Sequence, residues 1–150
     1  MEPLIRPMRE QDLPACAAIE ATALDAWSES QLADELNSQL SGGAGRLFVA
    51  ELDGRPRALA AFQLAAGEAS LYAITVDPAL RHQGIGRALL SGSLAALRAE
   101  GAESCYLEVR AENLPAQKLY TGLGFQMAGR RKSFYKDPPD DALVMNVLFD

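Results

Sequence analysis

The chain has 150 residues, with 14 Lys and Arg against 20 Asp and Glu, which gives a formal net charge of −6. The hydrophobic share of 49% favours a folded globule over a disordered chain, and the length suits one domain covering residues 1–150. The acidic balance argues against nonspecific nucleic-acid binding, which needs clustered Lys and Arg. A basic peptide is a more natural partner, although the charge can also serve solubility alone.

Cysteine and histidine usage argues against a metal centre. Cys16 and Cys105 lack a CxxC spacing and His82 is the one histidine, so we expect no metal. Buried free thiols in a reducing cytoplasm are expected, with one disulfide as the alternative. The N-terminus lacks the apolar core of a signal peptide and no run of 18 apolar residues occurs, so no membrane span is expected.

The N-terminal third predicts one strand followed by two helices. Leu4–Met8 is expected as a short strand, and Asp12 as the N-cap of the helix that follows it. Ser28 and Gln31 fit a capping box, in which each residue's side chain bonds the other's backbone N–H. This pattern predicts a second helix over residues 29–40.

Three apolar runs come next and predict an antiparallel meander. They cover Leu47–Leu52, Ala58–Ala65 and Ala69–Val76. Asp53-Gly54 lies between the first two runs and is a strong signal for a tight hairpin turn.

The remaining chain alternates helices with strands. Leucines at helical spacing predict an amphipathic helix over Arg87–Glu100, followed by a strand over Ser104–Val109. A short helix is expected over Pro115–Leu123, and the last two strands over Met127–Tyr135 and Leu143–Leu148. The pattern is that of a mixed α/β domain.

The segment Arg81–Arg87, which reads RHQGIGR, has the character of a phosphate-binding loop. It precedes a helix whose first N–H groups are unpaired and positively polarised, and glycines let such groups approach an anion. The Walker A pattern is absent, and the dinucleotide fingerprint would need Gly or Ala where Leu89 stands. A glycine-rich helix start without a ligand is the alternative.

Val76-Asp77-Pro78 followed by Arg81-x-x-Gly84-x-Gly86 resembles the acetyl-CoA motif of the GNAT acetyltransferases. The resemblance implies the GNAT fold, a mostly antiparallel sheet of six or seven strands that splays between strands 4 and 5, with about four helices. In that fold the loop N–H groups hold the CoA pyrophosphate, and the preceding strand binds the pantetheine arm. The acetyl-CoA-binding residues carried over are Ile74, Thr75, Val76, His82, Gln83, Gly84, Ile85, Gly86, Arg87 and Asn113.

A second segment supports the same family. LEVRAEN over 107–113, followed by Leu119-Tyr120 and Gly124-Phe125, resembles the GNAT pattern around its fifth strand. WSE at 27–29 and RR…FY…DDA over 130–142 resemble the RimI type, which acetylates the N-terminal alanine of a small-subunit ribosomal protein. The resemblance therefore implies a protein N-terminal acetyltransferase, with a ribosomal protein N-terminus or a similar peptide as its partner.

Two side chains are candidates for acid–base chemistry. An α-amine has a pKa of roughly 7.7–8.0, so a proton acceptor helps to supply the neutral nucleophile. The resemblance gives that role to Glu108, and the proton for the leaving thiolate to Tyr120. Each has a structural alternative, namely a solvent-facing strand Glu and a half-buried core Tyr. Asn113 can act as a helix cap as well as a CoA ligand, and the backbone N–H of Val76 is a candidate for binding the acetyl oxygen.

Two other functions remain open. One is a GNAT enzyme that acts on another amine, such as a small metabolite or a lysine, and the other is a noncatalytic acetyl-CoA-binding module. The presence of both Glu108 and Tyr120 argues against the module. A monomer or weak dimer is expected, with neither nucleic acid nor a membrane as a partner.

Overall fold

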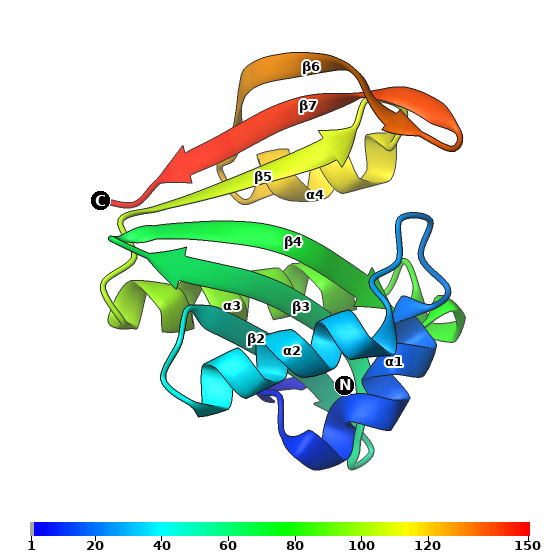
Figure 1. The fold of residues 1–150 in the computed structure, drawn as a ribbon, viewed down its shortest axis with the longest axis vertical. Helices are drawn as coiled ribbons and strands as arrows, with labels where there is room; N and C mark the ends of the chain where they lie inside the picture. Colours follow the sequence, from blue (N-terminus) through cyan, green and yellow to red (C-terminus); the bar gives the residue numbers. More distant parts are fainter. Residues whose placement is uncertain (1) are drawn as a thin grey trace.

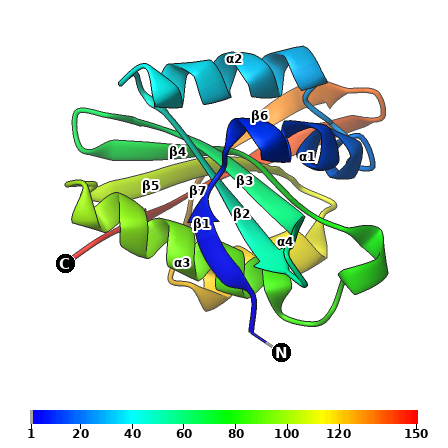
Figure 2. The same cartoon turned by 90° about the horizontal axis from the view of Figure 1, so that it is seen from below.

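The computed structural model describes residues 2–150 as one seven-stranded sheet with four α-helices and two short 3₁₀ helices (Figures 1 and 2). The strand order is β1-β2-β3-β4-β5-β7-β6, and β4 with β5 is the parallel pair. The elements are β1 (Leu4–Pro7), η1 (Glu10–Asp12), α1 (Leu13–Glu20), α2 (Glu29–Leu40), β2 (Gly45–Leu52), β3 (Arg55–Ala65), β4 (Glu68–Val76), η2 (Pro78–Leu80), α3 (Ile85–Ala99), β5 (Ser104–Arg110), α4 (Leu114–Gly122), β6 (Gln126–Lys136) and β7 (Pro139–Leu148). The expected mixed α/β sheet is confirmed.

The helices cover the sheet in two layers, with α1 and α2 on one face and α3 and α4 on the other (Figure 2). Strand alternation sends Leu47 and Leu59 to the α1–α2 side, where they pack with Leu32 of α2. Phe48 and Phe62 belong to the larger cluster on the α3–α4 side. Both faces of the central strands are therefore buried, and the core is split by the sheet.

Two local sequence signals form the expected structures. Ser28 Oγ accepts from Gln31 N at 3.1 Å, and Gln31 Oε1 accepts from Ser28 N at 2.8 Å, which completes the capping box of α2. Asp53 and Gly54 have φ of 53° and 75°, the positive values that a tight β-hairpin turn requires. Cys16 and Cys105 are free and buried, as expected.

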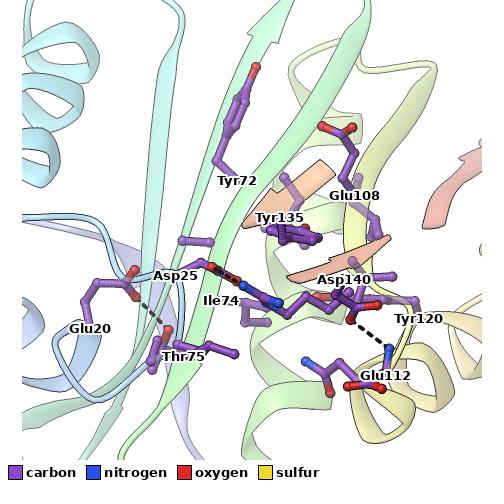
Figure 3. Close-up of a pocket in the computed structure, with 18 of the residues that line it drawn as sticks. Glu20, Asp25, Tyr72, Ile74, Thr75, Glu108, Glu112, Tyr120, Tyr135 and Asp140 are labelled. Carbon is purple, nitrogen blue, oxygen red and sulfur yellow. Dashed lines mark hydrogen bonds and ion pairs between the residues drawn. The ribbon is translucent and has the colours of Figure 1, made fainter. Parts of the chain in front are cut away.

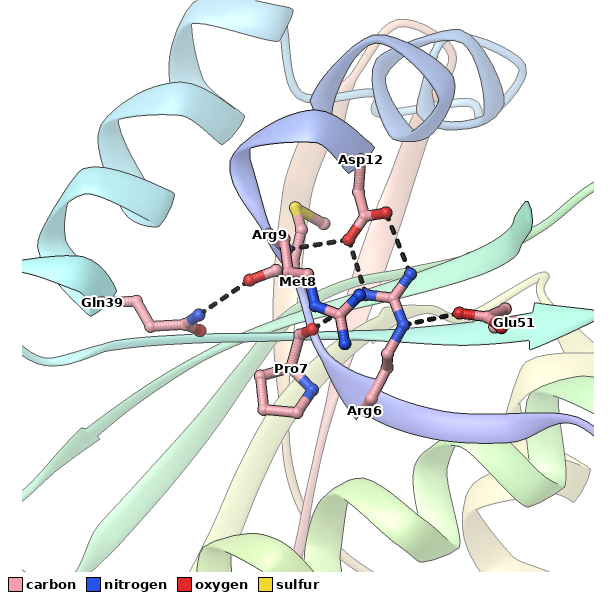
Figure 4. Close-up of polar contacts among 7 residues, drawn as sticks. All are labelled: Arg6, Pro7, Met8, Arg9, Asp12, Gln39 and Glu51. Atoms are coloured by element: carbon pink, nitrogen blue, oxygen red, sulfur yellow. Dashed lines mark hydrogen bonds and ion pairs between the residues drawn. The ribbon is translucent and has the colours of Figure 1, made fainter. Parts of the chain in front are cut away.

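Asp12 is the N-cap residue of α1, as predicted, but its side chain bonds elsewhere and not to the helix (Figure 4). Its carboxylate accepts from Arg6 Nη1 at 2.7 Å and Nη2 at 3.0 Å, and from the Arg9 backbone N–H at 2.8 Å. Burial opposes ionisation of Asp12, but these hydrogen bonds outweigh it and its pKa lies below the usual range. Arg6 also donates to Glu51 at 2.8 Å, so this cluster fastens β1 to β2 and to the first helical turn.

The sheet splays where β4 leaves β5, as the family resemblance implied (Figure 1). Glu68–Leu71 pairs with Ser104–Leu107, and the pairing ends there. Leu71 and Ala73 face consecutive residues of β3, so Tyr72 between them is the extra residue of a β-bulge. A bulge bends and twists its strand, which accounts for the divergence of β4 from β5.

The start of α3 lies two residues earlier than predicted, at Ile85 instead of Arg87. Gly84 is the N-cap residue and has a φ of 82°, a left-handed conformation that glycine adopts without a Cβ penalty. None of the helices formed by residues 2–150 is long and apolar enough to cross a membrane.

Candidate active site

A cleft of about 420 Å³ opens where β4 and β5 separate (Figure 3). Its walls come from the α1–α2 loop, β4, β5, α4 and the turn between β6 and β7. Five of the residues that the sequence singled out line it, namely Ile74, Thr75, Glu108, Asn113 and Tyr120. Segments far apart in the chain therefore meet at one site.

The loop before α3 presents backbone donors. The first hydrogen bond of α3 runs from Ala88 N to the O atom of the N-cap residue Gly84, at 3.0 Å. The N–H groups of residues 85–87 come before this bond and therefore have no partner within the helix. His82 has a φ of 64° and, like Gln83, is exposed, so both contribute backbone and not a buried side chain. This arrangement suits an anion at the positive end of the helix.

Gly86 joins this loop to the cleft. A Cβ at this position would lie 3.5 Å from Val76 Cγ2 and 3.9 Å from Leu119 Cδ2, next to cleft residue Tyr120. Arg87 Nη2 donates to Gly122 O at 3.3 Å, so its exposed side chain lies along α4. The loop, the end of β4 and the end of α4 thus lie together beside the cleft.

The backbone of β4 has free hydrogen-bonding groups on the cleft side. Asp77 N donates to Arg57 O at 2.8 Å, and antiparallel ladders alternate between bonded and non-bonded pairs. By that alternation the N–H and C=O groups of Ile74 and Val76 point away from β3, toward the space that β5 has left. Those of Thr75 point to Leu59 of β3, so Thr75 differs from its two neighbours.

Glu108 and Tyr120 occupy different surroundings in the cleft. The Glu108 side chain is 23% exposed, and its Oε2 lies 3.2 Å from Arg131 Nη1. Tyr120 is 6% exposed, with its ring centroid 5.8 Å from that of Phe125. Burial raises the pKa of Tyr120, so the phenol stays protonated through neutral pH. A carboxylate and a protonated phenol in one cleft are a pairing suited to acid–base catalysis.

Asn113 has the first of its two expected roles. Its Oδ1 accepts from Ala116 N at 3.2 Å, which confirms the predicted cap of α4. The same residue lines the cleft.

Arg110 organises a cluster that the sequence did not reveal. Its Nε and Nη2 donate to the two Asp25 oxygens at 2.8 and 2.9 Å, and Nη1 donates to Pro138 O at 2.7 Å. The guanidinium lies over the Tyr135 ring, 4.3 Å from its centroid. Its pKa is raised, chiefly by the hydrogen bond to Asp25. Arg110 therefore ties the α1–α2 loop to the β6–β7 turn across the cleft.

Glu20 at the end of α1 was also missed. The side chain is buried, with 1% exposure, and accepts from Trp27 N at 2.8 Å and from Thr75 Oγ1 at 2.6 Å. The Trp27 ring packs against Tyr72, with centroids 6.0 Å apart. Glu20 thus fixes the α1–α2 loop against β4. The contacts of Glu20 join positions up to 55 residues apart, and local sequence patterns carry no signal for them.

Comparison with known proteins identifies the family. Residues 11–125 match the acetyltransferase (GNAT) family. The ribosomal protein bS18-alanine N-acetyltransferase of Escherichia coli strain K12 is 36% identical over 144 residues, or 94% of each chain.

Solved structures agree. The crystal structure of the ribosomal-protein-S18-alanine N-acetyltransferase from Escherichia coli superposes with a TM-score of 0.87 at 36% identity, covering 97% of this chain and 93% of that one. PaiA N-acetyltransferase from Thermoplasma acidophilum, solved in complex with coenzyme A, shares the fold at 18% identity and a TM-score of 0.80, covering 99% and 100%. From the family match and the relatives alike, this chain belongs to the acetyltransferase (GNAT) family and is an acyltransferase.

Proposed function

We propose that this chain transfers the acetyl group of acetyl-CoA to the N-terminal α-amine of a protein, with the N-terminal alanine of ribosomal protein bS18 as the acceptor. The observation that carries the proposal is the cleft that places Glu108 and Tyr120 beside a helix start with free N–H groups. The Escherichia coli relative, named for this reaction, supports the choice of acceptor.

Acetyl-CoA fits the groups that the loop and β4 offer. The N–H groups of residues 85–87 are placed to bind the pyrophosphate, which the positive end of α3 also stabilises. His82, Gln83 and Gly84 shape the loop that leads to them. The free backbone groups of Ile74 and Val76 can pair with the amides of the pantetheine arm in place of a neighbouring strand. Thr75 supports this strand through its bonds to β3 and Glu20.

The chemistry then follows from the two titratable side chains. Glu108 removes a proton from the incoming ammonium, directly or through a water, and the neutral amine attacks the thioester carbonyl. The Val76 N–H is the donor proposed for the developing oxyanion. Collapse of the tetrahedral intermediate breaks the carbon–sulfur bond, and Tyr120 donates its proton to the leaving thiolate. The nitrogen then gives up its second proton, which restores the Tyr120 phenol through solvent, and Glu108 releases its own proton to water. Its raised pKa keeps that proton available.

The rim of the cleft suits a basic acceptor. Asp25, Glu112 and Asp140 line it, and Arg110 is held by Asp25. We place the reaction in the cytoplasm, where ribosomal proteins are available.

Glu108→Gln and Tyr120→Phe test the chemistry. Each variant keeps its shape and loses a proton-transfer group, so turnover on a peptide with an N-terminal alanine should fall by roughly 10²–10⁴-fold while acetyl-CoA still raises the melting temperature. The loss for Glu108→Gln should shrink at high pH, where the amine is already neutral, whereas Tyr120→Phe should show little rescue. Full turnover in both variants would remove these residues from the mechanism.

The acceptor is tested separately. Peptides that differ only in residues one to four, and a panel of lysine-containing peptides and small amines, are incubated with acetyl-CoA and the products are weighed by mass spectrometry. Acetylation at the α-amine of the bS18 sequence should dominate. Equal modification of lysine or small amines would favour the broader GNAT activity instead.

A further inference from the structure

An irregular stretch of β6 places two aromatic rings beside the cleft. Arg131 faces Ala142 of β7, and Tyr135 faces Asp140, so three residues of β6 stand opposite one of β7. The Ser133 N–H at this bulge donates to Asp141 Oδ1 at 2.8 Å. The rings that follow, those of Phe134 and Tyr135, meet edge to face with centroids 5.1 Å apart.

Each ring carries an arginine, and each arginine reaches a carboxylate. Arg110 lies 4.3 Å from the Tyr135 centroid and pairs with Asp25. Arg131 lies 5.4 Å from the Phe134 centroid and pairs with Glu108. The first set fastens two loops, whereas the second ends at the proposed catalytic base.

The sheet leaves a path for Arg131 to reach Glu108. Arg131 is on β6, and β7 lies between it and β5. The residues of β7 and β6 in line with Glu108 are Val144 and Gly129, and Gly129 has no side chain to fill the space. Ala142, which separates Arg131 from β5, is small. The guanidinium can therefore extend over β7 to the carboxylate.

The two oxygens of Glu108 differ in a way that matters for a base. Oε2 is buried and, within residues 2–150, makes no directed hydrogen bond, so its contact with Arg131 at 3.2 Å is an ion pair. Oε1 is not among the buried atoms that lack a partner, and the Glu108 side chain lines the cleft. Arg131 thus pairs with the buried oxygen, so that Oε1 is the oxygen that can face the cleft.

We propose that Arg131, supported by the Phe134 ring, is a positioning residue that holds the Glu108 carboxylate with Oε1 toward the incoming amine. The inference rests on the proposed function, because it takes Glu108 as the base. A glutamate side chain has several rotatable bonds, and a fixed cation on one oxygen selects among its orientations. Proton transfer depends steeply on such placement.

Arg131→Met tests the inference against a matched control, Arg130→Met. Both arginines lie on β6, with side chains 55% and 56% exposed, and Arg130 pairs with Asp141 outside the cleft. With acetyl-CoA and the bS18 N-terminal peptide, Arg131→Met should lose about 10-fold in kcat with little change in acceptor KM. Arg131→Lys should recover part of that loss, and Arg130→Met should stay within about two-fold of the parent. Thermal melting checks that each variant is folded.

The double variant with Glu108→Gln separates this inference from the proposed function. If Arg131 acts through Glu108, adding Arg131→Met to Glu108→Gln should cause no further loss of kcat. Equal kcat losses for Arg131→Met and Arg130→Met, or a full second loss in the double variant, would overturn the positioning role while leaving Glu108 as the base. A fully active Glu108→Gln single variant would instead remove Glu108 as the base of the proposed reaction.

Discussion

Arg110 shows how much one buried cation can depend on one partner. Its side chain is 9% exposed, whereas that of Asp25 is 49% exposed. An exposed ion pair contributes about 0–1 kcal/mol, but a buried group left without its partner costs about 1–3 kcal/mol. Because Pro138 O would still accept from Arg110, we expect Asp25→Ala to lower the free energy of unfolding by about 1–2 kcal/mol.

Urea unfolding measures this loss, and exposed Asp34 on α2 provides the control. Asp34→Ala should change stability by less than about 0.5 kcal/mol. Asp25→Ala should also raise the acceptor KM, because the two loops that Arg110 joins would no longer be held together. Equal stability of the two variants would show that Arg110 does not need this carboxylate.

Glu20 differs from Arg110 because both oxygens of its carboxylate accept a hydrogen bond. Oε1 accepts from the Thr75 hydroxyl and Oε2 from the Trp27 N–H. The Thr75 hydroxyl can also accept, so Glu20→Gln can keep both contacts with its amide oxygen toward the Trp27 N–H and its amide N–H toward Thr75 Oγ1. It loses only the charge assistance of the two bonds and should cost about 1 kcal/mol. Thr75→Val leaves Oε1 of the buried Glu20 carboxylate without its partner and should cost more, about 1–3 kcal/mol. Calorimetric melting of both variants checks the order, and the reverse order would contradict it.

At this scale the sequence located some site residues and not others. Glu108 and Tyr120 lie in a segment whose pattern is continuous along the chain, so both could be found before the structure. Asp25 reaches Arg110 across 85 positions, and Tyr135 reaches it from another strand. Such meetings are decided by how the strands pack, which a single sequence does not display.

The start of α3 is the element on which donor binding is predicted to depend. A Cβ at Gly86 would make ordinary contacts at 3.5 and 3.9 Å, so Gly86→Val should fold, while its branched side chain would stand between the loop and β4. We expect the melting temperature without ligand to change by only a few degrees and the acetyl-CoA-induced rise to fall sharply. An unchanged ligand-induced rise would place the donor elsewhere.

Element boundaries were predictable where the signal was local. Ser28 with Gln31, and Asp53 with Gly54, carry their structure within a few residues. The bulge at Tyr72 has no such mark, although it is the feature that turns β4 away from β5. The splay itself was expected only through the family resemblance, since no pattern within the strands required it.

The whole molecule should lose stability at alkaline pH. Burial raises the pKa of the Cys16 and Cys105 thiols from 9.0 to about 12, and it also raises that of Tyr120. Between about pH 9 and 12 the unfolded chain therefore releases protons that the folded chain retains, and stability falls as pH rises. Each group that is ionised in the unfolded chain and protonated in the folded one lowers the free energy of unfolding by about 1.4 kcal/mol per pH unit.

Melting temperatures recorded from pH 7 to 11 test this dependence. Cys105→Ala should begin from a lower stability, because a buried side chain is shortened, but its decline above pH 9 should be shallower than that of the parent. The test is the slope of melting temperature against pH above pH 9, and not the melting temperature at pH 7. Parallel declines would mean that the Cys105 thiol ionises in the folded chain as readily as in the unfolded one.

The gap between β4 and β5 is closed at both ends, by the pairing of Glu68–Leu71 at one and by Arg110 with Asp25 at the other. The loop before α3 lies on the α3–α4 side of the sheet, whereas Arg110 pairs with Asp25 of the α1–α2 loop on the other side (Figure 2). If acetyl-CoA binds from the first side and the peptide from the second, both substrates can be bound at the same time, and neither has to leave before the other binds. Initial-rate plots at several fixed donor concentrations should therefore give intersecting lines, and acetyl-CoA alone should leave no acetyl group on the protein by mass. In the proposed reaction the acetylated peptide can dissociate while CoA is still bound. The order of product release then depends on the separate affinities of the chain for the acetylated peptide and for CoA.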